Sequence, residues 1–313
     1  PLDPKGPTVD VTKAPYKADN SGKKDATAAI QKALDDVGAK GGGVIFMPAG
    51  TYRLVPPTGQ SSALFIRHSG VVLRGAGRGL TFLFNDATQM RNRSVITVGP
   101  TKSASWYGSG GTLRKLAKNA ANRSVLLSLS SASGLKAGDW IVAHADATAA
   151  WVAEHNMVGL WTDKMVQGPT FLRQITKVTG NTLTIDIPLR YPLLTRDGAR
   201  VYKAETHLHQ VGMEDFAVGM RQHQGTTGWG DNDYNTKGKA AYEVHGADLI
   251  RFRYVIDGWA QRIQTYRPAV NTKLVHMLSD GFVLAHSRNI TIRDCVISHP
   301  QYEGGGGNGY SFV

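Results

Sequence analysis

The sequence has little cysteine and no long apolar run. Cys295 is the single cysteine, so an internal disulfide framework is excluded and stability must come from the burial of side chains. No stretch of about 18 consecutive apolar residues occurs, which excludes a membrane-spanning helix. The chain begins at Pro1 rather than at methionine, which indicates a removed export signal or a boundary of the sequence.

Negative charge is also scarce. The 313 residues include 36 Lys and Arg against 24 Asp and Glu, a formal net charge of +12, and such a surface attracts polyanions. Acidic polysaccharide, an anionic cell envelope and nucleic acid are the partner classes that this charge allows. The basic residues are scattered and no nucleic-acid-binding motif occurs, so we expect no specific nucleic-acid partner.

Short apolar alternations are the strongest positive signal. In 279–313, Phe282 and Leu284 alternate as in a strand, and further alternating positions follow after two bends. A similar frame recurs at 209–218 and 244–257, and 62–77 fits it as well. The matched apolar positions are Val211, Met213 and Phe216, then Ile250, Phe252 and Val255, then Ile290, Ile292 and Cys295, spaced by 39 and 40 residues. One such unit cannot bury its apolar row alone, so the pattern predicts a stacked solenoid with Cys295 as a buried thiol.

A helix precedes these repeats. The apolar spacing of 25–37 predicts an amphipathic helix that Asp25 caps and Gly38 ends. Residues 41–54, GGGVIFMPAGTYRL, predict strand, turn and strand. Because the apolar end of a solenoid must be covered, we expect the helix to cap it.

These opening segments, together with VVLRGAGRG at 71–79, resemble the start of the secreted pectate-lyase-like superfamily. The resemblance implies an all-β fold, a right-handed parallel β-helix with an N-terminal capping helix, in a secreted or cell-surface protein. The superfamily includes polysaccharide lyases, glycoside hydrolases, epimerases and phage tailspikes. This chain has neither the Asn-Thr-Asp and Asp-Asp pairs of polygalacturonases nor the Asp-Pro-His-Asp of alginate epimerases. No catalytic residue is therefore transferred by motif.

A segment of different composition interrupts the coil. Residues 124–145 and 171–193 alternate like antiparallel hairpins, with a turn at 179–181. We predict N-terminal cap and first rungs at 1–99, an inserted small antiparallel β subdomain at 100–200, and further rungs at 201–313. Trp106, Trp151 and Trp161 of the insertion either flank a sugar cleft or pack the subdomain.

Polar residues follow the last apolar position of each predicted repeat. Stacking would place these matching positions on one wall, about 4.8 Å apart. The wall would consist of Trp259 and His299, then Gln222, Gln261 and Gln301, then His223, Arg262 and Tyr302. Trp229 and Tyr266 lie in loops that leave the same wall. Such residues suit a sugar groove, although a glutamine ladder with solvated loops would give the same pattern.

Carboxylates near this wall suggest two reactions. Asp257 occupies an apolar column, so either its rung is distorted or it serves a site. For β-elimination, His299 or Tyr302 would be the base, with Arg262 neutralising a uronate carboxylate. For hydrolysis, two carboxylates roughly 5 to 9 Å apart are required. The candidates for that pair are Asp257, Glu243, Asp280 and Glu303.

Metal signals are weak. Asp231 and Asp233 alternate as in a calcium loop, but Thr236 replaces the expected glycine and no glutamate occupies the twelfth position. A solvated loop and a Ca²⁺ site both remain open, and no other cofactor is indicated. His286 and His299 lack a third ligand at metal spacing. The Gly75-Ala-Gly77-Arg-Gly79 run predicts a β-helix corner rather than a phosphate loop.

The C-terminal residues repeat the opening of a rung. Gly309 to Val313 matches the strand that begins at Gly281, and an exposed last rung would leave apolar groups and strand-edge hydrogen bonds open. We therefore expect the coil to continue, in further residues or in a second polypeptide. The leading hypothesis is a carbohydrate-active enzyme that cleaves an acidic polysaccharide, by elimination rather than hydrolysis. The alternatives are a glycoside hydrolase and a non-catalytic, tailspike-like or structural glycan-binding surface protein.

Overall fold

A computed structural model describes residues 5–101, 113–162, 166–204 and 207–313. The chain forms two compact units, one of Pro1–Thr101 with His207–Val313 and one of Lys102–Thr206. No helix among the described residues is long and apolar enough to cross a membrane.

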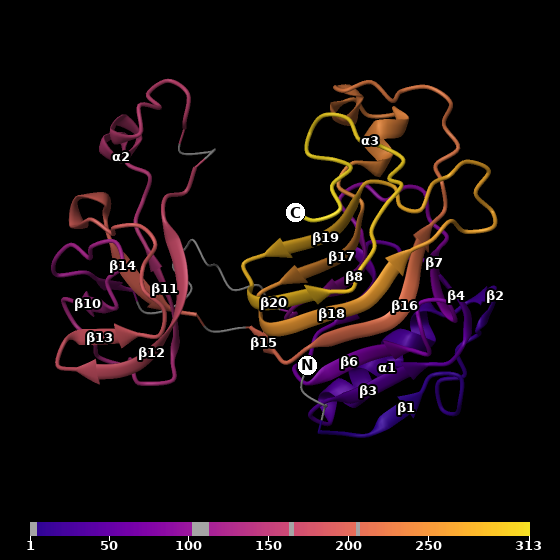
Figure 1. Cartoon of the computed structure of the whole chain (residues 1–313), viewed down its shortest axis with the longest axis horizontal. Helices are drawn as coiled ribbons and strands as arrows, with labels where there is room; N and C mark the ends of the chain where they lie inside the picture. Colours follow the sequence, from indigo (N-terminus) through magenta and orange to yellow (C-terminus); the bar gives the residue numbers. More distant parts are fainter. Residues whose placement is uncertain (1–4, 102–112, 163–165, 205–206) are drawn as a thin grey trace. The chain divides into compact units, whose positions relative to one another are not determined.

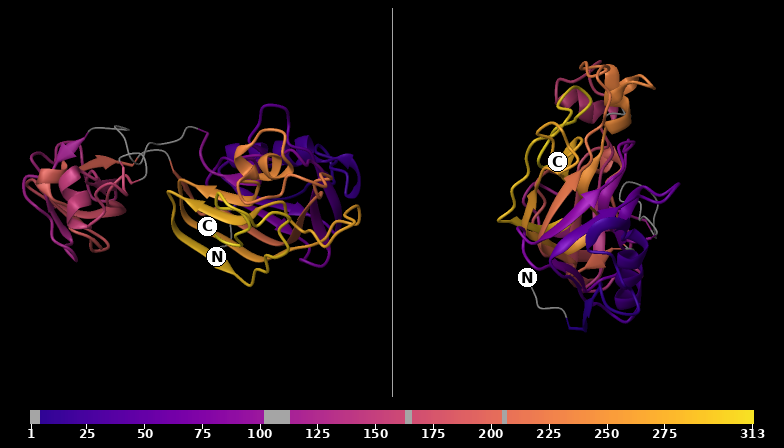
Figure 2. Two further views of the ribbon diagram at one scale, coloured as in Figure 1. Left: turned by 90° about the horizontal axis from the view of Figure 1, so that it is seen from above. Right: turned by 90° about the vertical axis from the view of Figure 1, so that its right-hand side faces the viewer.

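Parallel strands in two curled sheets build the first unit (Figures 1 and 2). In the first sheet lie β1 (Thr8–Asp10), β2 (Ser21–Asp25), β3 (Gly43–Met47), β4 (Gly50–Leu54), β6 (Val71–Gly75), β7 (Thr81–Asn85), β15 (Leu208–His209), β16 (Gly212–Met220), β18 (Val255–Thr265) and β20 (Arg288–Arg293). In the second lie β5 (Ser62–Ile66), β8 (Ser94–Val98), β17 (Asp248–Arg253) and β19 (Asp280–Ala285). All these pairings are parallel, and only β2–β4 among them has a shift in register, which confirms the predicted β-helix.

The rungs stack directly across the inserted segment. Leu73 of β6 lies opposite Met213 of β16, although the whole second unit separates them in sequence. Figure 1 shows this as the purple β6 beside the orange β16. Ile45, Leu73 and Met213 are fully buried in one continuous core, so the coil has no break where the insertion leaves it.

The predicted cap is present as α1 (Thr27–Ala39). Its buried face includes Ile30, Leu34 and Val37, and the helix packs on β3, β5 and β6. The Asp25 carboxylate accepts a hydrogen bond of 2.9 Å from the Thr27 backbone N–H, which satisfies one of the unpaired donors at the helix start. The strand, turn and strand predicted after it are β3 and β4.

The predicted alignment of the repeats is wrong at its middle member. Met213 pairs with Ala260, and Ala260 pairs with Ile292, whereas Phe252 lies in the second sheet opposite Val98 and Leu284. Apolar alternation is the same on every face of a β-helix, so it does not say to which sheet a strand belongs. The loops between strands also differ in length from rung to rung, and a constant spacing therefore misassigned β17.

The last rung is less covered than those below it. Ile290, Ile292 and Ile297 are only partly buried where they pack on the core, while Met213 and Phe216 are fully buried. Val296 is 54% exposed. Cys295 is likewise only half-buried rather than enclosed as predicted, and its burial raises the pKa of its thiol.

The second unit is an antiparallel sheet with a core of its own. Its strands are β9 (Arg114–Lys115), β10 (Leu126–Ser128), β11 (Trp140–His144), β12 (Thr170–Thr179), β13 (Thr182–Ile185) and β14 (Arg200–Lys203). The helix α2 (Ala149–Glu154) and the short 3-10 helix η1 (Thr195–Asp197) lie in its loops. Hairpin β12–β13 turns at Gly180 and Asn181, where a turn is predicted.

Candidate functional site

Two rows of outward side chains run across the first sheet, perpendicular to its strands. The sheet register aligns Val44, Val72, Gly212, Trp259 and Thr291 in one row, and Phe46, Arg74, Glu214, Gln261 and Arg293 in the next. The alternating residues point inward to the core. Because strands stack about 4.8 Å apart, each side chain in a row contacts its neighbours.

Trp259 forms the apolar floor of this surface. It packs with Val44 and Val72, and Phe46 contacts the same cluster. Its indole ring lies over Gly212, where a Cβ atom would come within 2.1 Å of the ring. Glycine at this position therefore makes room for the tryptophan, which is 7% exposed.

Glu214 is a buried carboxylate in the adjoining row, only 3% exposed. Arg74 Nε lies 2.5 Å from its Oε1, and the Gln261 amide and the Trp259 indole N–H both donate to Oε2. Arg262 lies 3.8 Å from the same oxygen. A buried charge is tolerated when cations and donors compensate it in this way.

A hollow of about 360 Å³ opens beside these rows over β18 and β20, and we call it the sheet groove. Its walls come from the last two rungs of the first sheet. The lining residues are Gln210, Asp257, Gly258, Trp259, Gln261, Asn289, Thr291 and Arg293. Asp257 and Arg293 are the two ionisable residues among them, so the groove presents one carboxylate and one guanidinium above an aromatic floor.

Asp257 lies at a repeated corner of the coil. It and its matched neighbours Gln210 and Asn289 all have positive φ, at 60°, 54° and 54°. Asn289 Nδ2 donates a hydrogen bond of 2.8 Å to Asp257 Oδ1, and Asp257 is exposed. Asp257 therefore does not lie in an apolar column, because Val218 pairs with Thr265 and the matched neighbours of Asp257 are polar. The corner presents the carboxylate to the groove.

Arg293 is the cation of the groove. Its Nη2 donates a hydrogen bond of 2.8 Å to Gln261 Oε1, and its side chain is 55% exposed. Arg262, the cation that the sequence pattern favoured, is bidentate to Asp215, at 2.6 and 2.7 Å. This pairing raises the pKa of Arg262 and occupies the donors that a uronate would need.

The predicted wall of three glutamines does not form. Gln261 lies in the sheet groove, whereas the Gln301 side chain bonds to the backbone N and O of His223, at 2.7 and 2.8 Å. Gln222 bonds to Thr272 and to the backbone of Lys273. These amides fix loops, and the prediction failed because it rested on the misassigned β17.

A loop cluster brings several of the other predicted residues together. His223 lies 5.8 Å from Trp229 between ring centroids, and Trp229 lies 6.0 Å from Tyr302. His223 Nε2 is 3.6 Å from Glu243. Tyr302 is 2% exposed and its hydroxyl lies 3.1 Å from the carbonyls of Gly230 and Asp231. Burial raises the pKa of Tyr302, so it is unsuited to the predicted role of base.

The remaining predicted residues lie apart from the groove lining. His299 is exposed and its ring centroid is 4.4 Å from that of His276. Tyr266 is half-buried, edge-on to Phe82 at 5.0 Å, and its burial raises its pKa. Glu303 is an exposed loop residue.

The loop of Asp231 and Asp233 precedes the 3-10 helix η2 (Asp233–Asn235). Asp233 Oδ2 accepts a bond of 2.8 Å from the Gly230 N–H. Among the residues that the structure describes, no group of three or more His, Cys, Asp or Glu is arranged to hold a metal ion. The described residues therefore supply no set of ligands for the predicted Ca²⁺ ion.

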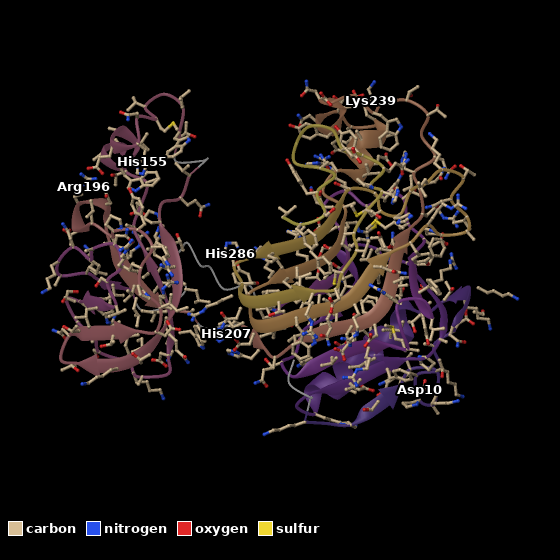
Figure 3. The ribbon with its side chains drawn as sticks, viewed as in Figure 1. Asp10, His155, Arg196, His207, Lys239 and His286 are labelled. Atoms are coloured by element: carbon tan, nitrogen blue, oxygen red, sulfur yellow. The ribbon has the colours of Figure 1, made fainter. Side chains whose placement is uncertain are left out.

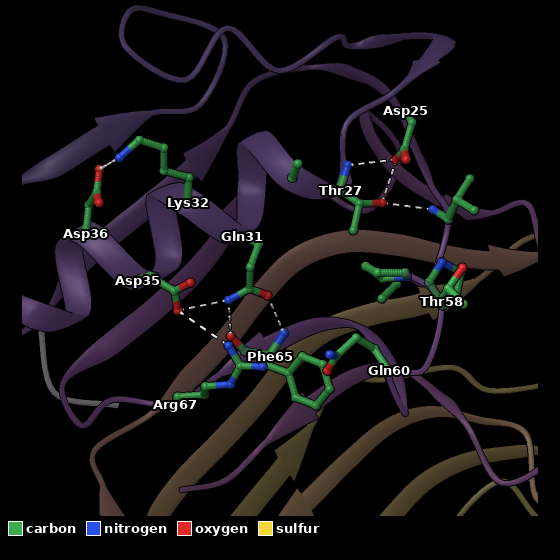
Figure 4. Close-up of a pocket in the computed structure, with 15 residues that line it drawn as sticks. Asp25, Thr27, Gln31, Lys32, Asp35, Asp36, Thr58, Gln60, Phe65 and Arg67 are labelled. Atoms are coloured by element: carbon green, nitrogen blue, oxygen red, sulfur yellow. Dashed lines mark hydrogen bonds and ion pairs between the residues drawn. The ribbon is translucent and has the colours of Figure 1, made fainter. Parts of the chain in front are cut away.

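A larger hollow, about 730 Å³, lies between α1, the loop at 55–60 and β5 (Figure 4). Its polar groups are used within the fold. Gln31 is bonded to both backbone groups of Phe65, at 2.8 and 3.0 Å, and Lys32 pairs with Asp36 at 2.7 Å. We take the sheet groove as the candidate site, because it combines a carboxylate and a guanidinium with the Trp259 ring in one hollow.

A family profile described as rhamnogalacturonase A/epimerase, pectate lyase-like, matches residues 10–240. The chain belongs to this family.

A mannuronan C5-epimerase, AlgE3, of Azotobacter vinelandii is 38% identical over 68 residues, which are 22% of this chain and 4% of that protein. Alginate lyase 7 of the same organism is 38% identical over 68 residues, 22% of this chain and 8% of that protein. The tailspike gp61 of Pseudomonas phage phi297 has a TM-score of 0.49 at 13% identity, covering 93% of this chain and 49% of that one. The chain thus spans about half of the tailspike chain and matches less than a tenth of either curated relative.

Glu214 and Arg293 are the site residues that sequence reasoning missed. Both signals were present, since Glu214 follows the inward Met213 and Arg293 follows the inward Ile292. In a strand, a charged residue directly after an inward apolar one points to the opposite face. Only the correct register, with Gln261 between them, shows that they share one surface.

Proposed function

We propose that the chain is a carbohydrate-active enzyme that binds an acidic, uronate-containing polysaccharide in the sheet groove and cleaves it by β-elimination. The observation that carries the proposal is that exposed Asp257 and exposed Arg293 line one hollow together with Trp259. An aromatic floor with a few convergent polar groups is typical of a small-molecule or sugar site. The net charge of +12 favours an anionic substrate.

Each groove residue has a role in this scheme. Arg293 binds the uronate carboxylate, because a guanidinium matches a carboxylate in geometry and charge. This interaction makes the proton on the adjacent sugar carbon more acidic. Asp257 accepts that proton as general base, and the electron pair left on carbon forms the double bond as the glycosidic oxygen leaves. Asn289 orients Asp257 through its hydrogen bond.

Hydrolysis needs a second carboxylate on the other side of the scissile bond. Glu214 lies on the same face, but it is 3% exposed and already bonded to Arg74 and Gln261. Asp294 is exposed and pairs with Arg293 at 3.4 Å, but it does not line the groove. This favours elimination over hydrolysis. The family membership and the match to an alginate lyase and a C5-epimerase support a reaction that begins at the carbon beside a uronate carboxylate. A substrate of this kind lies outside cells, so we also propose a secreted or surface location.

The test uses alginate and polygalacturonate, each with the full chain. We expect ultraviolet absorbance from unsaturated uronate ends to rise during digestion. Asp257→Asn should lower kcat by roughly 10² or more, the usual share of a general base. Arg293→Gln should raise KM and also lower kcat, because Arg293 both binds the uronate and acidifies the proton that is removed. Asp36→Asn, a change of the same chemistry on the α1 surface, is the matched control and should leave both constants unchanged.

Three results would decide between this proposal and its alternatives. New reducing ends without the absorbance would assign hydrolysis. Binding without any product, unaffected by Asp257→Asn, would assign a tailspike-like binding protein. Unchanged turnover in Asp257→Asn and Arg293→Gln would remove the sheet groove as the site.

A further inference from the structure

Four rings gather on the second unit at one end of its sheet. Trp151 of α2 lies 4.0 Å from His155 and 5.6 Å from Trp161 between ring centroids, and its stacking angle with Trp161 is 23°. Tyr191 lies 5.8 Å from His155. We call Trp151, His155, Trp161 and Tyr191 the aromatic cluster. In Figure 3 the labelled His155 lies beside α2.

Hydrogen bonds hold the cluster in place. Tyr191 Oη lies 2.9 Å from His155 Nε2, and His155 Nδ1 lies 2.6 Å from the Trp151 carbonyl oxygen. Thr148 caps α2 by accepting from the Trp151 N–H. Rings with fixed orientation lose little entropy when a ligand packs on them.

The cluster is not part of the hydrophobic core of its unit. That core comprises aliphatic residues such as Leu127, Ile141, Leu183 and Val201, and none of the four rings packs in it. A packing role for Trp151 and Trp161 would therefore be confined to this cluster, and Trp106 lies outside the described residues. The two tryptophans pack against His155 and Tyr191 instead.

Exposed apolar and unused polar groups adjoin the rings. Val158 and Leu160, between His155 and Trp161 in the chain, are 73% and 65% exposed. The Trp151 indole N–H is buried and has no hydrogen-bond acceptor among the residues that the structure describes. Exposed apolar groups collected near aromatic rings mark an interaction surface, and a buried N–H without a partner costs free energy until an acceptor reaches it.

We propose that the aromatic cluster is a second glycan-binding site, which takes an acidic oligosaccharide segment. Aromatic faces pack on the C–H faces of pyranose rings, and the Trp151 N–H and the Tyr191 hydroxyl add polar groups at the ring edges. Residues 102–206 contain 13 Lys and Arg against 7 Asp and Glu, which favours an anionic chain. The site lies in a separate unit, so it goes beyond the function of the sheet groove.

The test is affinity electrophoresis of the full chain in gels that contain alginate, with dextran as the neutral comparison. Trp161→Ala should weaken retention in alginate about tenfold, and Tyr191→Phe should weaken it less because only one hydroxyl is lost. Trp140→Ala, an aromatic of β11 outside the cluster, is the matched control and should bind as the native chain does. Turnover of a short oligouronate should be unchanged in Trp161→Ala, which separates this site from the groove.

Three outcomes would overturn the proposal. Native retention by both Trp161→Ala and Tyr191→Phe would show that the cluster binds no glycan. Equal weakening by Trp140→Ala, with native retention by Tyr191→Phe, would show a loss of folding rather than of a site. Self-association in sedimentation velocity that Trp161→Ala abolishes would make the occupant a second copy of the chain.

Discussion

Replacing Asp248 by asparagine should remove a pH dependence from the stability of the β-helix. Asp248 begins β17, is 1% exposed and lies opposite Asp280 of β19. Its Oδ2 bonds to Ser94 at 3.0 Å and to Arg251 Nε at 2.6 Å, but its Oδ1 has no hydrogen-bond partner. Burial, with a smaller contribution from Asp280, raises the pKa of Asp248 to about 6, and Arg251 opposes the shift.

The sign follows from proton binding in the two states. Between the ordinary pKa of 3.8 and about 6, the folded chain binds the proton more tightly than the unfolded chain. This contribution to stability is therefore full below pH 4 and is lost as pH rises through 6. At about 1.36 kcal/mol for each pH unit, the loss is about 3 kcal/mol for Asp248. Burial also raises the pKa of Asp280, which adds to the loss in the same direction.

The assay is guanidinium unfolding at a series of pH values from 4 to 7, with hydrogen exchange of β17 and β19 as the readout for the first unit. Asp248→Asn should reduce the fall in unfolding free energy across this range by about 3 kcal/mol. Asp36→Asn is the control, because Lys32 lowers the pKa of that exposed carboxyl, and it should leave the fall in place. If Asp248→Asn shows the native fall, the carboxyl titrates at its ordinary pKa and the reasoning is refuted.

Two further predictions concern the sheet groove and the last rung. Gly212→Ala should destabilise the first unit by about 1 to 3 kcal/mol, because the added Cβ would lie 2.1 Å from the Trp259 ring. Thermal unfolding measures this loss. An unfolding midpoint equal to that of the native chain would contradict the placement of the indole. Backbone amides of β20, which pairs with β18 alone among the described strands, should exchange faster than those of β16, which pairs on both sides. Exchange mass spectrometry tests the second prediction, and a further rung, from following residues or a second polypeptide, should slow the exchange of β20.

Local signals predicted the architecture well. The apolar face of α1 and the Pro-Ala turn between β3 and β4 depend on neighbouring residues, which the sequence shows directly. The Gly180-Asn181 turn of the insertion is of the same kind. Apolar alternation around Met213 and Ile292 likewise predicted stacked strands, because a β-helix must bury one side of every strand.

The site could not be predicted in the same way, because it depends on register between distant rungs. Gln261 contacts Glu214 and Arg293 only because β18 lies between β16 and β20, and loops of unequal length determine that order. The role of Asp257 depends on a positive φ that no alternation reveals. Tyr302 was favoured as a base for its chemistry, but its burial under a loop, which excludes it, is a tertiary property.

The direct pairing of β6 with β16 also has a consequence for synthesis on the ribosome. The inserted unit completes its sheet from strands that all lie within residues 114–203, so it can fold before the later rungs are translated. The edge of β6 must wait for a partner translated 140 residues later. Until then the nascent coil has a strand edge whose backbone N–H and C=O groups are unpaired. A delay in translation after Thr206 would therefore prolong the period in which this edge can pair with a wrong strand.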